Sequence, residues 1–331
     1  MDHYQNIQVI HIDQSNSYLI LDEKIAIIDI LDDRFQWIKC IEKKLDNQIP
    51  DYLISFTPLN EDDQSLIYKH YPNITLLSLP ISYDIIINLG KYHLHIYKDL
   101  ALCYESFSQS LFSYLYLSSA DHLSLLEGLR YNYYHYFLHD KKKISLMLEK
   151  VNNLHIKRIY PKYGHVLIDD ILLYLHFYKL WSHHIPEENG IVLCFQKKQQ
   201  KSLDITLNLS SLLHQKGENT FLFDLDQYSH ISLILQLMKY DRLMFITVDY
   251  NQEMKQAFMS FVDQLQKYQY QNRMIGWLYD DTIPHDFINE SLFIFNQWNM
   301  IDVKQFHTDI DLEDLVKQMM ETGCLNGECF E

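Results

Sequence analysis

Residues 51–73 read DYLISFTPLNEDDQSLIYKHYPN, and this stretch gives the clearest indication of the fold in the first half of the chain. Tyr52–Phe56 is a short apolar run, which is typical of a buried β-strand. A polar loop follows, and then a short helix that ends at Tyr71-Pro72-Asn73, because proline cannot continue a helix. The stretch predicts a strand, a loop and a helix, the repeating unit of a layered α/β protein.

The sequence on either side continues the same alternation. Apolar residues recur at helical spacing over Phe35–Leu45, so a helix is expected there. Strands are expected at Gln8–Asp13, Ser17–Ile30 with a turn at Asp22-Glu23, Ile74–Leu79 and Tyr92–Tyr97. The alternation continues to Ile159, and a helix over Leu167–Trp181 closes the first domain. This order predicts an αββα sandwich.

The pattern of expected strands and helices changes after residues 183–190. This polar stretch contains a proline and a glycine and is typical of a linker. Short apolar strands then alternate with helices. The expected strands are Ile191–Phe195, Thr220–Leu225, Leu243–Val248, Met274–Leu278 and Val303–Phe306. Such βα repeats predict a parallel, doubly wound sheet of flavodoxin type. We therefore expect two domains, residues 1–185 and 186–331.

The composition narrows the classes of function. The chain of 331 residues is 47% hydrophobic, enough to bury a sizeable core. Its 28 Lys and Arg against 44 Asp and Glu give a net charge of −16, which argues against nucleic-acid and anionic-membrane partners. The polar N-terminus, MDHYQNIQ, and the lack of a long apolar run lead us to expect a cytoplasmic protein.

Residues 51–73, together with NSYLILDEKIAIID at 16–29, resemble the opening of the flavodiiron proteins. The resemblance implies a metallo-β-lactamase-like αββα sandwich followed by a flavodoxin-like domain. Members of that family reduce dioxygen or nitric oxide with two irons and FMN. They form head-to-tail dimers that bring one subunit's flavin beside the other's metal centre.

The family's His-x-Glu-x-Asp-His motif aligns without a gap on Thr57, Leu59, Glu61 and Asp62. The family's Pro-x-His-Gly turn aligns on residues 161–164, where Tyr163 replaces the histidine. The region that should supply another histidine, CYESFSQS at 103–110, has none. Non-haem iron needs imidazole and carboxylate ligands at fixed points, so the resemblance implies that the diiron centre is lost.

Other ligands stay open as alternatives. The family also has an aspartate that bridges the two metal ions, and Asp121, His122 and Glu127 are equally good candidates for its position. His165 is a candidate replacement for the histidine that Tyr163 has displaced. Glu61 and Asp62 either hold a hard cation through oxygen or form the acidic first turn of a helix. We favour the helix turn. We also expect aromatic side chains such as Tyr163 and Phe107 to fill the former iron cavity.

The FMN loops are altered as well. The phosphate loop is QKKQQKS at 196–202, where Ser202 matches the family but no glycine is present. The second flavin loop, Thr247-Val248-Asp249-Tyr250-Asn251, keeps Thr247, Tyr250 and Asn251, and Trp277 matches a Gly-Trp pair in the third. These five residues are the vestigial FMN positions. We expect no bound cofactor, with retained FMN as the alternative.

The leading hypothesis is a degenerate flavodiiron-like protein without catalytic residues. It would act as a binding, regulatory or structural subunit, as a homodimer or with an intact paralogue. The alternative is a flavoprotein oxidoreductase with an atypical site, and a zinc hydrolase is a third reading. Cys324 and Cys329 near the C-terminus are either free thiols or a reversible redox or metal-binding pair.

Overall fold

The computed structural model describes residues 6–13, 15–98, 100, 102–117, 125–138, 141–226, 230–268, 270–298 and 301–321. The chain divides into two compact units, Met1–Lys179 and Leu180–Glu331. The division falls in the last turn of helix α5 (Ile171–Ser182), N-terminal to the expected domain limit at residues 185 and 186. Asp121, His122, Cys324 and Cys329 lie outside the described residues.

The N-terminal unit is built on one curled sheet. Its strands are β1 (Ile7–Ile12), β2 (Ser15–Leu21), β3 (Ile25–Ile28), β4 (Tyr52–Ser55), β5 (Thr75–Ser78), β6 (Ile85–Asn88), β7 (His93–Ile96), β8 (Leu102–Glu105), β9 (Ser110–Leu117) and β10 (Arg158–Gly164). The order is β5-β4-β3-β2-β10-β9-β8-β7-β6, with β1 paired to β2. In the described residues the backbones of β2 and β10 pair at Ser15 and Tyr163 alone, so the sheet folds there into two halves.

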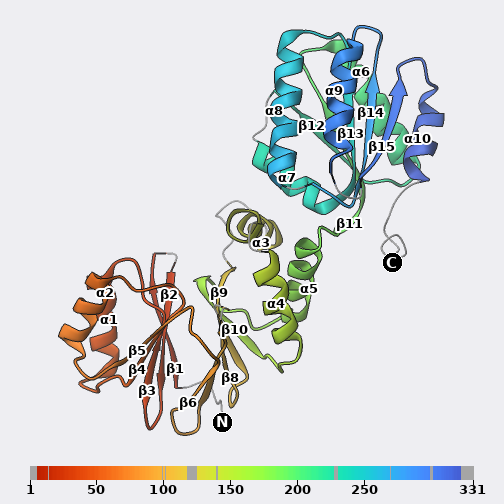
Figure 1. Ribbon diagram of the computed structural model, residues 1–331. Coiled ribbons are helices and arrows are strands. Elements are labelled where there is room, and N and C mark those ends of the chain that lie inside the picture. The colour runs from red at the N-terminus through yellow and green to blue at the C-terminus, as the bar shows by residue number, and fades with distance from the viewer. Residues whose placement is uncertain are drawn as a thin grey trace. The chain divides into compact units, whose positions relative to one another are not determined.

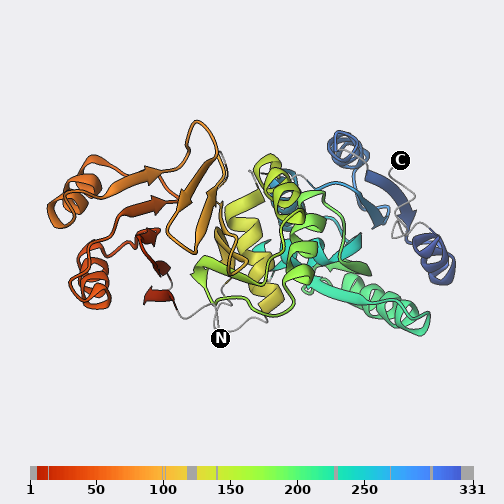
Figure 2. The ribbon, with the colours of Figure 1, turned by 90° about the horizontal axis from the view of Figure 1, so that it is seen from below.

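Helices cover both outer faces of this sandwich. They are α1 (Arg34–Leu45), α2 (Glu61–His70), α3 (Leu125–Asn132), the π-helix η1 (Tyr133–Phe137), α4 (Lys141–Asn152) and α5. Helices α1 and α2 lie on one side of the strands, and α3, α4 and α5 on the other (Figures 1 and 2). The αββα sandwich is therefore confirmed.

Two apolar cores follow from the alternation of side chains along the central strands. Tyr18 and Ile20 of β2 point inward, to Leu94 of β7 and Phe112 of β9. Leu19, between them in β2, points outward to the core beneath α1 and α2. Because neighbouring residues of β2 face different cores, the strand is buried almost throughout.

The C-terminal unit is a five-stranded parallel sheet in the order β12-β11-β13-β14-β15. Its strands are β11 (Glu188–Phe195), β12 (Thr220–Asp224), β13 (Tyr240–Thr247), β14 (Arg273–Tyr279) and β15 (Ile301–His307). Its helices are α6 (Gln200–Gln215), α7 (His230–Lys239), α8 (Gln252–Tyr268), α9 (His285–Phe295) and α10 (Leu312–Met320). This is the predicted doubly wound, flavodoxin-like sheet.

The two faces of this sheet carry different cores. Aliphatic side chains such as Met244 pack with Leu209 of α6 and Leu315 of α10. On the other face the aromatic rings of Phe245 and Trp277 pack against α8 and α9. In the described ranges, no helix is both long and apolar enough to cross a membrane.

Gly190, at the start of β11, is required by close packing. A Cβ atom there would overlap the ring of Tyr240 and come within 3.1 Å of the Asn219 carbonyl oxygen. We expect Gly190→Ala to lower the free energy of unfolding by about 1–3 kcal/mol, as overpacking does, measured by chemical denaturation.

Gly276→Ala is the matched control. The three atoms nearest to its Cβ would be the sulfur of Met244 and the sulfur and methyl carbon of Met319, and these flexible side chains can adjust more easily than a ring. We expect the smaller cost for this variant. Equal losses in the two variants would show that the rigid ring is not what requires glycine at position 190.

Candidate functional site

The loop after β4 holds the first vestigial metal positions, and its side chains diverge. Leu59 is buried in the core beneath α1 and α2. Asn60 caps α2 by accepting a hydrogen bond from the amide of Asp63 at 2.7 Å. Glu61 and Asp62 follow in the exposed first turn of α2, where acidic side chains favour the helix dipole. These residues form a helix start.

Thr57, the remaining position of this loop, is held through its backbone. Its carbonyl oxygen accepts hydrogen bonds from the hydroxyls of Ser55 at 2.7 Å and Ser78 at 3.1 Å. The hydroxyl of Ser78 also accepts the amide of Leu59 at 3.1 Å. Two serines therefore fix the loop at the carboxyl ends of β4 and β5.

Residues 161–164, which align with a turn of the family, belong here to strand β10, so the expectation of a turn is wrong. The strand has a register shift between Pro161 and Tyr163. The side chain of Asn16 donates hydrogen bonds to the carbonyls of Pro161 at 3.1 Å and Gly164 at 2.7 Å, and the hydroxyl of Tyr18 also donates to Pro161. These bonds hold the end of β10 against β2.

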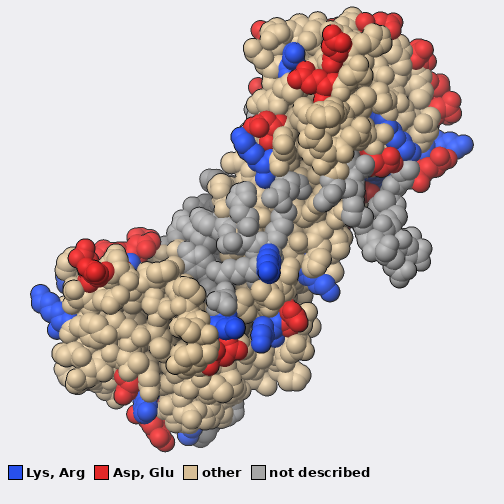
Figure 3. Space-filling model, in the orientation of Figure 1, with Lys and Arg blue, Asp and Glu red and all other residues tan. Residues whose placement is uncertain are grey.

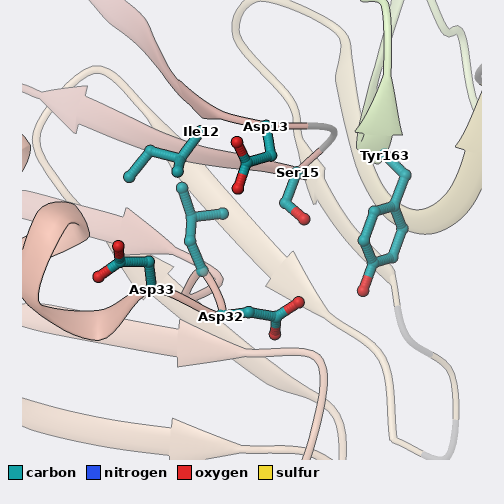
Figure 4. Close-up of a pocket in the computed structure, with 7 residues that line it drawn as sticks. Ile12, Asp13, Ser15, Asp32, Asp33 and Tyr163 are labelled. Carbon is teal, nitrogen blue, oxygen red and sulfur yellow. The ribbon is translucent and has the colours of Figure 1, made fainter.

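Tyr163 lines a pocket of about 320 Å³ (Figure 4). The pocket is also lined by Ile12, Asp13, Ser15, Leu31, Asp32 and Asp33. Its three carboxylates do not converge in Figure 4: Asp33 caps α1 by accepting the Gln36 amide, and Asp32 is mostly exposed. Of the vestigial metal positions only Tyr163 reaches this pocket. Among the described residues, no group of three His, Cys, Asp or Glu side chains could hold a metal ion.

A buried ion pair, not foreseen from the sequence, lies between the two segments that carry Thr57 and Tyr163. The ammonium of Lys162 is 3.0 Å from Oδ2 of Asp29, and the two side chains are 5% and 1% exposed. Oδ1 of Asp29 accepts the amides of Ile30 at 3.0 Å and Phe56 at 3.3 Å. The protein thus places its own cation next to two of the positions that the family resemblance aligns with metal ligands.

Burial and the lysine act in opposite directions on Asp29. Burial raises the pKa of the Asp29 carboxyl and Lys162 lowers it. The effect of burial is larger, so the pKa of Asp29 lies above its usual value. Asp29 also has a positive φ of 63°, which bends the chain sharply after β3. The sequence contained one signal for this feature, an aspartate directly after an apolar strand. Its partner Lys162 lies 133 residues further along the chain (29 to 162), and nothing in the sequence links the two.

The other expected residues do not complete a metal site. His165 is exposed. Phe107 is half-exposed and packs edge to face on Tyr92, with ring centroids 5.5 Å apart, and it does not line the pocket that Tyr163 reaches. Glu105, in the stretch where the family resemblance called for histidine, is fully buried and accepts the amides of Phe107 and Ser108.

The phosphate loop of the C-terminal unit is bonded across to the other two flavin loops. The Lys201 ammonium lies 2.5 Å from Oδ2 of Asp280, after β14. The Gln199 side chain donates to the carbonyl of Asp249, after β13, at 3.2 Å. Ser202 is buried and donates to the Ile246 carbonyl at 3.2 Å. These bonds tie together three loops that would have to face a flavin phosphate and ring.

Asp280 is stabilised as the anion. Burial alone would raise its pKa, but hydrogen bonds from Lys201, Thr282 and the amide of Asp249 leave the pKa of Asp280 below its usual value. The Asp280 anion therefore balances the charge of the Lys201 ammonium within the chain.

The remaining vestigial FMN residues are used inside the fold. The Trp277 indole is buried and donates to Oγ1 of Thr247 at 2.6 Å. Asn251 caps α8 by accepting the amide of Met254 at 2.8 Å. The Tyr250 ring lies 5.6 Å from the ring of Phe287. The five residues lie near one edge of the sheet, but they do not present a phosphate cradle.

The fold itself has clear relatives. The chain is similar in structure to rubredoxin oxygen:oxidoreductase from the anaerobe Desulfovibrio gigas, with a TM-score of 0.69 and 14% identity over 96% of this chain and 92% of that one. It is also similar to the flavodiiron protein from Giardia intestinalis, with a TM-score of 0.65 and 16% identity over 95% and 88%. A flavoprotein from Thermotoga maritima is similar as well, with a TM-score of 0.65 and 13% identity over 93% of this chain and 89% of that one.

No protein-family model matches the sequence, and no curated protein is similar to it. The structural likeness nevertheless covers both units, so the chain has the fold of the flavodiiron proteins. The resemblance inferred from residues 16–29 and 51–73 is confirmed at the level of the fold.

The buried ion pair can be tested by a double-mutant cycle. Lys162→Met leaves the Asp29 carboxylate buried without its cation, which should cost about 3–5 kcal/mol of unfolding free energy at neutral pH. Adding Asp29→Asn to Lys162→Met removes the orphaned charge and should recover most of that loss. Chemical denaturation of the wild type, both single variants and the double variant measures the coupling.

The same variants test the pH dependence. Because the pKa of Asp29 is raised on folding, the folded state binds more protons than the unfolded state above the ordinary aspartate pKa. Its contribution to stability is therefore lost as the pH rises through the raised pKa. The double variant should lack this decline, and an identical pH profile in the two proteins would contradict the assignment.

Proposed function

We propose that this chain is a flavodiiron-like protein that works without catalysis, as a binding, regulatory or structural subunit. One observation carries the proposal: lysines of the chain itself form ion pairs at both places where the fold's cofactors would be held. Lys162 pairs with Asp29 in the N-terminal unit, and Lys201 pairs with Asp280 in the C-terminal unit.

The residues in the N-terminal unit do not fit a pair of irons. Leu59 offers no donor atom, and Glu61 and Asp62 belong to an exposed helix start. A metal ion next to the Lys162 ammonium would face a like charge in a buried place, where electrostatic repulsion is strong. The lysine supplies the positive charge that the buried carboxylate of Asp29 needs.

The residues in the C-terminal unit do not fit FMN. A phosphate cradle needs several free backbone amides and close approach of the backbone. Here Ser202 is buried and bonded to the Ile246 carbonyl, and Gln200 begins α6 where the family has a glycine. To admit the cofactor, the contact between Lys201 and Asp280 would have to break.

A binding role is supported by the surface. Leu172 is 83% exposed on α5, with Ile168 and Leu173 also exposed beside it in the sequence, and exposed apolar residues that gather together mark protein contacts. Acidic and basic side chains are interspersed over the face shown in Figure 3. We infer a protein partner, either a second copy or an intact paralogue, rather than nucleic acid or membrane.

The proposal includes a cytoplasmic location. Among the described residues Cys40, Cys103 and Cys194 are free, and burial raises the pKa of Cys103 and Cys194, so neither is a reactive thiolate. A reducing compartment suits such thiols.

The cofactor content is the first test. We expect the full chain, produced without oxygen and with iron and FMN supplied, to retain neither after gel filtration. Elemental analysis measures the iron, and flavin fluorescence after denaturation measures the FMN. The Glu61→Ala/His165→Ala variant serves as the control and should give the same metal content.

Two tightly held irons per chain, lost in that control variant, would overturn the proposal in favour of an oxidoreductase. FMN bound in a one-to-one ratio would do so as well.

The oligomeric state tests the binding role. We expect light scattering to give the mass of a dimer for the purified chain, or co-purification from the native cell to recover an intact paralogue. A monomer that recovers no partner would contradict a subunit role even if no cofactor is bound.

A further inference from the structure

Three oxygen-bearing side chains meet at the carboxyl edge of the parallel sheet, at the ends of its adjacent strands β11 and β12. Asp224 is the last residue of β12 and pairs in register with Phe195, the last residue of β11. Gln196 therefore follows directly beside Asp224, and the amide of Leu225 donates to the Phe195 carbonyl at 2.9 Å. Asp226 completes the group.

Hydrogen bonds fix one side of each group. Oδ1 of Asp224 accepts the amides of Lys197 at 3.2 Å and Asp226 at 3.1 Å. The Gln196 side-chain nitrogen donates to Oδ1 of Asp226 at 3.2 Å. This bond sets the orientation of the Gln196 amide, with its nitrogen toward the Asp226 carboxylate.

The other oxygen of each group is buried and has no hydrogen-bond partner. These atoms are Oδ2 of Asp224, Oδ2 of Asp226 and Oε1 of Gln196. Asp224 is 3% exposed and Gln196 is 5% exposed. A buried polar atom without a partner costs free energy, so three acceptors in one small region call for a donor or a cation.

No ion pair among the described residues offsets the charge of this group. Within the part of the chain that the structure describes, neither Asp224 nor Asp226 forms an ion pair. The nearby loop lysine Lys201 is engaged with Asp280. Two carboxylates without a cation at a partly closed edge produce a strongly negative local potential.

We propose that Gln196, Asp224 and Asp226 form a binding site for a hard divalent cation, Mg²⁺ in the first place. Magnesium is usually held by one or two carboxylates and keeps several of its own waters, which suits two carboxylate oxygens and one amide oxygen at a sheet edge. The ion would satisfy all three orphaned acceptors and offset both charges. The site includes Gln196, the first residue of the loop aligned with the FMN phosphate loop, and it lies apart from Thr57, Tyr163 and the loops at Thr247 and Trp277. It does not rest on the proposed function.

The test uses Mn²⁺, which has similar ligand preferences and an electron paramagnetic resonance signal that falls on binding. We expect the full chain to bind one Mn²⁺ and Mg²⁺ to displace it. Asp226→Asn should lower the affinity more than about tenfold, because even outer-shell changes at metal sites cost about 10–100-fold. Asp263→Asn, which alters an exposed carboxylate paired with Lys267, is the matched control and should bind normally.

Asp224→Asn is the harsher variant, because Asp224 also accepts two backbone amides. Gln196→Leu supplies a further variant that leaves both carboxylates in place, and it should weaken binding less than Asp226→Asn. The thermal midpoint of the wild type should rise with Mg²⁺, and that of Asp226→Asn should not.

Two results would overturn the site. One is the absence of Mn²⁺ binding by the folded wild type, and the other is binding that Asp226→Asn and Asp224→Asn leave unchanged. Neither result bears on the iron and FMN assays, and iron bound through the N-terminal unit would leave the Mn²⁺ result intact. The two proposals can therefore fail separately.

Discussion

Asp29 and Lys162 come from opposite halves of the N-terminal sheet, and their ion pair is withdrawn from solvent. Asp29 directly follows β3. Lys162 lies in β10, next to Tyr163, whose backbone pairs with Ser15 of β2. A buried carboxylate without a partner would be very costly. The lysine therefore constrains how the two halves of the sandwich meet, and the bonds of Asn16 and Tyr18 to β10 depend on the same closure.

The same physical device recurs in the C-terminal unit. Lys201 brings a positive charge to Asp280, and the hydroxyl of Thr247 accepts a hydrogen bond from the buried indole of Trp277. In both units side chains of the chain itself satisfy polar groups at the ends of the strands, where α/β folds commonly hold ligands. The cluster of Gln196, Asp224 and Asp226 differs, because three of its oxygen atoms have no partner in the fold.

The sequence predicted the layers well and the sites less well. The αββα sandwich follows from the apolar and alternating strands around Tyr52–Ser55, and the flavodoxin-like sheet follows from the βα repeats after Glu188. Burial imposes these patterns of apolar residues on any sequence that forms such layers. Glu61 and Asp62 were correctly favoured as a helix start, a local property. The end of β10 was misjudged as a turn, because its pairing with β2 and β9 depends on residues far away in the chain.

From the sequence alone came the alternation of strands and helices in both units, the lack of histidine at positions 57 and 163, and the excess of acidic residues. These are properties of single residues or of short-range periodicity. Only the tertiary structure decided that Lys162 pairs with Asp29, that Lys201 pairs with Asp280, and that three acceptor atoms at Gln196, Asp224 and Asp226 are left without partners. Such facts depend on distances between residues far apart in the chain, and packing sets those distances.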